Sequence, residues 1–61
     1  MGYYEIRKTD KITNQPYYFV LKASNGEIIA TSEMYSSKQG ARTGIASVQQ
    51  NGPTTDIRDK A

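Results

Sequence analysis

The chain has 61 residues, with eight basic and six acidic side chains and neither cysteine nor histidine. Disulfides and the common zinc sites are therefore excluded, and the length allows only one domain. Surface scaling gives roughly 9,900 Å² for the unfolded chain and about 4,000 Å² for a compact monomer, so burial is marginal. Unusually good packing or a partner subunit are the other usual ways to stabilise such a chain, and a second copy is the one left to test.

The distribution of apolar and charged residues argues against a membrane segment and a signal sequence. No apolar run approaches the ~18 residues that a membrane helix needs, and Met1–Ile6 contains no signal-peptide core. A net charge of +2 is too small to imply nucleic-acid binding by itself. We expect a soluble cytoplasmic protein.

The first half of the chain has the alternating pattern of an antiparallel sheet. Residues 3–8 and 17–23 alternate apolar with polar side chains and predict two strands, separated by a polar loop at 9–16. Asn25-Gly26 is a hairpin signal because both residues accept positive φ, and a third strand is predicted over 27–32. The connections are too short for parallel pairing, so the three strands form a meander.

A helix is predicted next, over residues 37–50. Ser36 and Gln39 have the spacing of a capping box. Asn51-Gly52-Pro53 supplies a stop signal. An apolar stripe with helical spacing is formed by Ala41, Ile45 and Val48.

Gly40 and Gly44 have the spacing of a membrane helix-dimer motif, but the surrounding helix is too polar for a bilayer. We interpret the two glycines as small residues that let the helix lie close to the sheet. This would offset their cost of ~1 kcal/mol each relative to alanine.

After the helix, residues 54–59 alternate Thr55 and Ile57 with charged neighbours and predict a short fourth strand. The alternative is a frayed terminus. The fold class is then α+β, a β-β-β-α-β unit with an antiparallel sheet and one helix packed on a face. The predicted core consists of Tyr4, Ile6, Phe19, Leu21, Ile28, Ala41, Ile45 and Val48.

Catalysis has little support in these residues. Without histidine, the one nucleophile–base option pairs Ser36 or Ser37 with Lys38, and a serine at a helix N-terminus is more simply a cap. Glu27 and Glu33 would lie about 20 Å apart on one strand, too far for paired-carboxylate chemistry. We predict no catalytic residue, no metal site and no cofactor.

The face of the sheet opposite the helix is the one arrangement with functional content. Tyr3, Arg7, Tyr18 and Lys22 share this face, and aromatic side chains interleaved with cations stack and neutralise single-stranded nucleic acid in several proteins. Glu5 on the same face repels phosphate. The alternative is a face that is solvated or covered by a partner, as a one-helix domain requires.

Four segments resemble the YegP-like family of uncharacterised bacterial proteins. The main one is Leu21–Glu33, which contains Asn-Gly-Glu-Ile-Ile-Ala-Thr-Ser-Glu, followed by the Tyr-Ser-Ser-Lys element at Tyr35–Lys38. Gly44–Val48 in the helix and Tyr4–Ile6 in the first strand continue the likeness. The resemblance covers nearly the whole chain. Two departures, at Met34 and at Arg42-Thr43, leave the core pattern intact and affect only surface functions at those positions.

The resemblance implies three strands, a helix and a further strand, present either as tandem repeats or as two subunits that share one continuous sheet. The C-terminal strands are then exchanged between the halves. Because this chain has one copy, the resemblance implies a homodimer in which residues 54–59 pair with the partner through Thr55 and Ile57. Because the family has no established activity, the resemblance implies no catalytic residue in this chain. We expect a non-enzymatic homodimeric interaction module, with single-stranded nucleic-acid binding as the alternative.

Overall fold

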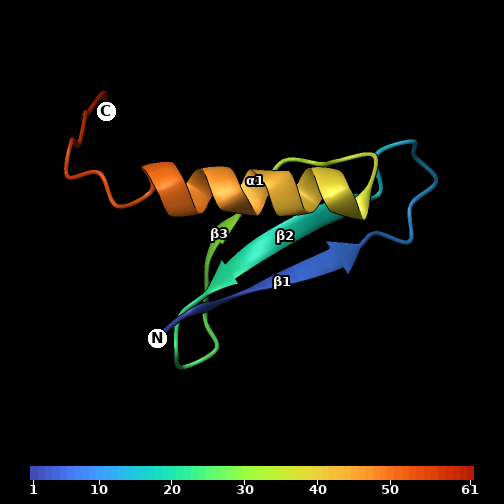
Figure 1. The fold of residues 1–61 in the computed structure, drawn as a ribbon, viewed down its shortest axis with the longest axis horizontal. Helices are drawn as coiled ribbons and strands as arrows, with labels where there is room; N and C mark the ends of the chain where they lie inside the picture. Colours follow the sequence, from blue (N-terminus) through green and yellow to red (C-terminus); the bar gives the residue numbers. More distant parts are fainter.

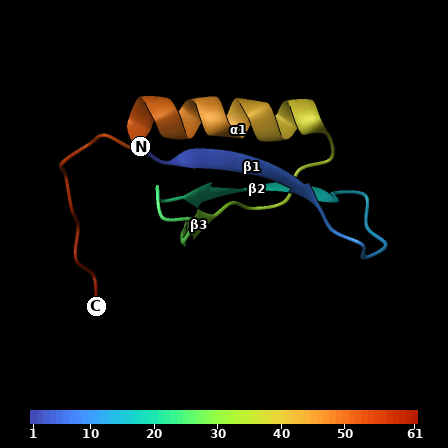
Figure 2. The same cartoon turned by 90° about the horizontal axis from the view of Figure 1, so that it is seen from below.

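The computed structural model describes residues 1–61 as three strands followed by one helix. The strands are β1 (Tyr3–Lys8), β2 (Tyr17–Lys22) and β3 (Ile28–Thr31), and the helix is α1 (Lys38–Asn51). The sheet is antiparallel in the order β1-β2-β3. The helix lies along one face of the sheet and leaves the other face open (Figures 1 and 2). The predicted α+β class and meander are confirmed.

The hairpin between β2 and β3 depends on one glycine. Gly26 has a φ of 88°, and no other residue adopts a positive φ. The Gly26 amide donates to the Ala23 carbonyl at 2.9 Å, and the Ala23 amide donates to the Glu27 carbonyl at 2.8 Å. Asn25 does not use the positive φ that we predicted for it. Its side-chain Oδ1 instead accepts the Glu27 amide at 3.1 Å.

A β-bulge in β3 moves Ile28 out of the predicted core. Leu21 pairs with Ala30, but Lys22 pairs with Ile28, so Ile29 is the extra residue. Such an insertion reverses which face the following side chains occupy. Ile28 therefore shares the open face with Lys22 and is 51% exposed, and its prediction as a core residue is wrong in this chain.

The core lies between the helix and β2. Phe19 and Ala41 are buried, as predicted, and they are 5% and 0% exposed. Five further predicted core residues are half-buried, namely Tyr4, Ile6, Leu21, Ile45 and Val48. The Tyr4 ring meets Phe19 edge-on with 5.9 Å between ring centroids. This small core is consistent with the marginal burial expected from the length.

The connection from β3 to the helix stays attached to β2. The Ser32 amide donates to the Phe19 carbonyl at 2.9 Å, and the Phe19 amide donates to Ser32 Oγ at 2.9 Å. Tyr35 and Tyr17 exchange two backbone hydrogen bonds of 2.7 and 3.0 Å. These bonds hold the Tyr35 ring beneath the helix, where it stacks on Phe19 at 6.1 Å.

Ser37 caps the helix, one residue after the predicted cap. Its hydroxyl accepts the Gly40 amide at 3.0 Å, and its backbone is extended. The predicted capping box of Ser36 and Gln39 is therefore wrong, because Tyr-Ser-Ser offers two hydroxyls and the spacing alone does not choose between them. The helix ends at Asn51 and not at residue 50.

Replacing Ser37 by alanine should lower the free energy of unfolding by about 1 kcal/mol, because the Gly40 amide loses its acceptor. In a domain of this size the melting temperature should fall by roughly 4–8 °C. Ser36→Ala is the matched control and should leave the melting temperature unchanged. Equal effects of the two substitutions in thermal melts followed by circular dichroism would contradict the observed cap.

Residues 54–59 form no strand in the single chain. Every residue from Pro53 to Ala61 is exposed, and the segment leads away from the sheet (Figures 1 and 2). Its hydrogen bonds are local, such as Arg58 Nη2 to Asp56 Oδ2 at 3.0 Å. The strand was predicted to pair with a second copy, and that pairing stays a prediction.

Candidate functional site

The open face of the sheet brings together the four side chains expected from the sequence. In the register of β1 and β2, Tyr3 lies opposite Lys22 and Arg7 lies opposite Tyr18. Residues opposite each other in an antiparallel pair project to the same side of the sheet. We call these four residues the aromatic–cation face. Each of its ends therefore combines one tyrosine with one cation.

Glu5 stands between the two cations. Its Oε1 accepts from Arg7 Nε at 3.1 Å and from Arg7 Nη2 at 2.8 Å, and its Oε2 lies 3.5 Å from Lys22 Nζ. The Glu5 carboxylate thus pairs with both cations, and the three side chains together carry a net charge of +1. Pairs at such an exposed surface contribute little to stability, but they reduce the charge available to an anionic ligand.

The ion pair between Glu5 and Arg7 shifts the pKa of each side chain in the direction that favours its charged form. The hydrogen bond from Arg7 lowers the pKa of Glu5 below its ordinary value; partial desolvation opposes this shift, and attraction by Lys22 adds to it. The pKa of Arg7 is raised, first by the hydrogen bond to Glu5 and then by the neighbouring Tyr18. Glu5 is therefore ionised at neutral pH and releases its two cations only in acid.

The centre of the open face is less exposed to solvent than the alternating pattern of β2 suggested. Val20 lies opposite Glu5 on β1 and Thr31 on β3, and it is only 1% exposed. The Lys22 side chain is 19% exposed, which shows that its stem lies down on the sheet. Long charged side chains commonly cover apolar surface in this way. Val20 therefore marks a second buried region, on the open face, that we did not predict.

The residues predicted to form the dimer lie away from this face. Thr55 and Ile57 belong to the exposed C-terminal segment, and Ile57 is 89% exposed. The segment that carries both residues leads away from the sheet (Figure 2).

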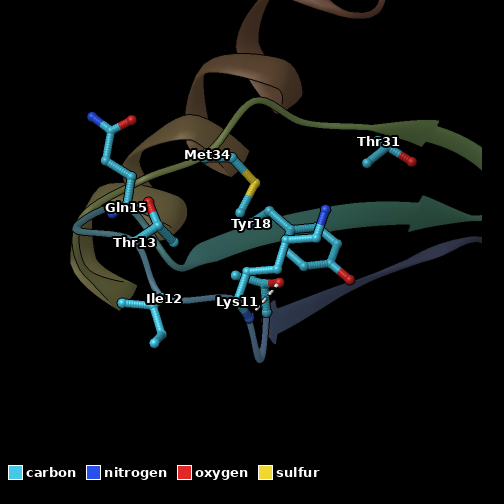
Figure 3. Close-up of a pocket in the computed structure, with 8 residues that line it drawn as sticks. Lys11, Ile12, Thr13, Gln15, Tyr18, Thr31 and Met34 are labelled. Atoms are coloured by element: carbon cyan, nitrogen blue, oxygen red, sulfur yellow. Dashed lines mark hydrogen bonds between the residues drawn. The ribbon is translucent and has the colours of Figure 1, made fainter.

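A pocket at one end of the open face was not predicted. It has a volume of about 480 Å³ and lies beside the loop between β1 and β2 (Figure 3). Its wall is formed by Thr9, Lys11, Ile12, Thr13, Gln15, Tyr18, Thr31 and Met34. The signal in the sequence was Ile12, the single large apolar residue in an otherwise polar loop, which the alternating strand pattern does not explain.

The residues considered for catalysis either cap the helix or lie exposed on the surface. Ser37 is the helix cap, while Ser36 and Lys38 are exposed. Glu27 and Glu33 are exposed beyond opposite ends of β3. No three carboxylate side chains gather closely enough to hold a metal ion. The helix is too short and too polar to cross a membrane.

The chain is similar to several proteins that carry the name UPF0339. It is 60% identical over 53 residues to the UPF0339 protein YegP of Yersinia pestis, covering 87% of this chain and 45% of that protein. It is 46% identical over 59 residues to YegP of Escherichia coli K12, covering 97% of this chain and 51% of that protein. The chain therefore spans about half the length of the curated relatives it matches.

A solved structure and a family model agree with these relatives. The solution structure of a protein from Haloferax volcanii matches with a TM-score of 0.78 at 34% identity, covering 95% of this chain and 93% of that one. The model of the domain of unknown function DUF1508 matches residues 13–59. The chain belongs to the DUF1508 family, which is the YegP-like family that its sequence resembles.

Proposed function

We propose that the protein is a cytoplasmic, non-enzymatic interaction module that works as a homodimer, with residues 54–59 exchanged between subunits. The observation that carries this proposal is the accessible surface of 5,047 Å². A compact monomer of this mass exposes about 4,000 Å². The excess of about 1,000 Å² compares with the ~800 Å² that each partner buries in a standard interface.

The shape of the chain supports the same proposal. The radius of gyration is 12.9 Å, whereas a compact chain of this length has about 10.5 Å. Part of this extension comes from the exposed C-terminal segment, which leads away from the sheet (Figure 1). A strand gains hydrogen bonds and buries Ile57 only by pairing with a sheet edge, and in the single chain this segment pairs with none.

The edge of the sheet at β3 offers such a place. All four residues of β3 are exposed, and Ile28 and Ile29 are 51% and 64% exposed. An exposed apolar edge strand presents unpaired backbone groups that readily take up another strand. The matched segment accounts for about half of each YegP relative, a proportion that two such units in one chain would give.

Substituting the exposed isoleucine of the C-terminal segment tests the homodimer. Ile57→Asp should weaken self-association at least tenfold, because a charge cannot be buried in the interface without a partner. Ile12→Asp is the matched control, since Ile12 is also fully exposed but lies in the loop between β1 and β2. Sedimentation velocity across a concentration series measures both. Equal association of Ile57→Asp and the unchanged protein would refute the exchanged segment.

Single-stranded nucleic-acid binding is the second candidate function. The register of β1 and β2 favours it, because each tyrosine of the aromatic–cation face stands beside a cation. Bases would stack on Tyr3 and Tyr18, while Arg7 and Lys22 would meet phosphates. Glu5 opposes this function by occupying both cations.

Removing the Glu5 charge should therefore raise the affinity for an oligonucleotide. We expect Glu5→Gln to bind an eight-residue thymidine oligomer several-fold more tightly than the unchanged protein at low salt, with amide shifts at Tyr3 and Tyr18. Glu33→Gln carries the same charge change away from the face and is the matched control. The absence of amide shifts in both proteins at low salt would remove this function, since phosphate contacts are strongest there.

A further inference from the structure

The pocket beside the loop between β1 and β2 has the size and the surroundings of a small-ligand site. Its volume of about 480 Å³ lies within the ~300–1,000 Å³ typical of such sites. The wall combines the Tyr18 ring, the Met34 side chain and Ile12 with the polar loop (Figure 3). Tyr18 belongs both to this wall and to the aromatic–cation face.

The polar part of the wall contains two threonine hydroxyls that accept hydrogen bonds from the backbone of the loop. Thr9 Oγ1 accepts the Lys11 amide at 3.3 Å, and Thr13 Oγ1 accepts the Gln15 amide at 3.2 Å. Each hydroxyl thus uses an acceptor position within the loop and keeps its own proton for a ligand. Lys11 adds a cation, and no carboxylate lines the pocket. Such a wall selects an anionic group.

The apolar part selects a flat ring. Tyr18 provides an aromatic surface, and Met34, which is 38% exposed, provides a polarisable side chain. A ring carrying an anionic group satisfies both parts of the wall, and a nucleotide has this chemistry. Because Tyr18 continues into the aromatic–cation face, the next nucleotides of a strand would follow β2 toward Lys22 and Tyr3.

We propose that this pocket binds one nucleotide, with the base against Tyr18 and the phosphate held by Lys11 and the hydroxyls of Thr9 and Thr13. The inference rests in part on the second proposed function, because a single strand would be one source of that nucleotide. A free mononucleotide is the other source.

Nitrogen–proton correlation spectra of the full chain at low salt test the proposal with adenosine 5′-monophosphate and with an eight-residue thymidine oligomer. We expect saturable shifts in residues 9–15, Tyr18 and Met34. Lys11→Gln should weaken binding several-fold, and Tyr18→Leu should weaken it tenfold or more through loss of stacking. Lys60→Gln removes the same charge at the C-terminal end and should bind within twofold of the unchanged protein. Because Lys11 is exposed, Lys11→Gln should fold normally. Its binding therefore decides the test even if Tyr18→Leu fails to fold.

The possible outcomes distinguish binding in the pocket from binding at the aromatic–cation face. Shifts in the pocket with the mononucleotide alone support the pocket and assign it to free nucleotides, and they remove the second proposed function. Tighter binding of the oligomer, with added shifts at Tyr3 and Lys22, supports the pocket and assigns it to a strand. Shifts at Tyr3 and Lys22 without any in the pocket overturn the pocket but keep the face. Equal losses in Lys11→Gln and Lys60→Gln, or no shifts at all, overturn the proposal.

Discussion

Removing residues 54–61 is expected to abolish cooperative folding at micromolar concentrations. In the single chain this segment buries nothing, because all of its residues are exposed. A monomer would therefore lose no stability on truncation after Pro53. In the proposed homodimer, the same truncation would remove the exchanged strand and expose the surface that it covers. For a domain with marginal burial and a stability of only a few kcal/mol, that loss exceeds what the remaining core can offset.

Circular dichroism melts of the truncated and complete chains measure this effect. A second variant keeps the length of the chain and replaces residues 54–59 by glycine and serine, which separates the loss of the strand from the loss of the chain end. Both variants should lose the thermal transition. A transition at the unchanged temperature in either variant would mean that the segment is a frayed terminus, the alternative that the sequence left open.

Gly44→Ala is expected to lower the melting temperature by up to roughly 15 °C. A Cβ at this position would overlap the Tyr35 hydroxyl and lie 2.8 Å from Tyr35 Cζ and 3.0 Å from Phe19 Cε2. The Tyr35 ring cannot swing away easily, because its backbone is bonded to Tyr17 and its ring stacks on Phe19. Overpacking of this kind costs about 1–3 kcal/mol, against ~1 kcal/mol gained in helix propensity, so the net loss is up to about 2 kcal/mol.

Gly40→Ala is the matched control in the same helix. A Cβ there would lie 3.4 Å from Ser37 Oγ and 3.5 Å from Tyr35 Cβ, which is ordinary contact. We expect its melting temperature to be unchanged or higher. Adding Tyr35→Phe to Gly44→Ala removes the overlapping hydroxyl and should restore part of the loss. If Gly40→Ala and Gly44→Ala have equal effects, the close approach at Gly44 is not what limits this packing.

The elements were predictable because their signals are local. Alternation over 3–8 and 17–23, the Asn-Gly pair and the helical stripe each depend on neighbouring residues, and the observed strands and helix begin and end within one residue of the prediction. Close packing at Gly44 was also predicted and is confirmed. The four residues of the aromatic–cation face followed from alternation alone, since β1 and β2 pair without irregularity.

Apart from the cap residue and the Asn25 backbone, the features that the sequence missed have one physical origin, because each depends on contacts between distant segments. The bulge that exposes Ile28 is set by how β3 meets Lys22, which no periodicity in the strand records. Tyr35 packs under the helix through its bridge to Tyr17, and Val20 is covered by charged side chains of its own and a neighbouring strand. The pocket likewise forms only where a loop, a strand and the connection after β3 come together.

The homodimer is tested most directly by the mass of the complete chain in solution. Sedimentation equilibrium at micromolar concentrations should give twice the 6.8 kDa of one chain, with dissociation on dilution accompanied by loss of the folded signal. A well-folded species with the mass of a single chain under the same conditions would contradict the homodimer and the exchange of residues 54–59.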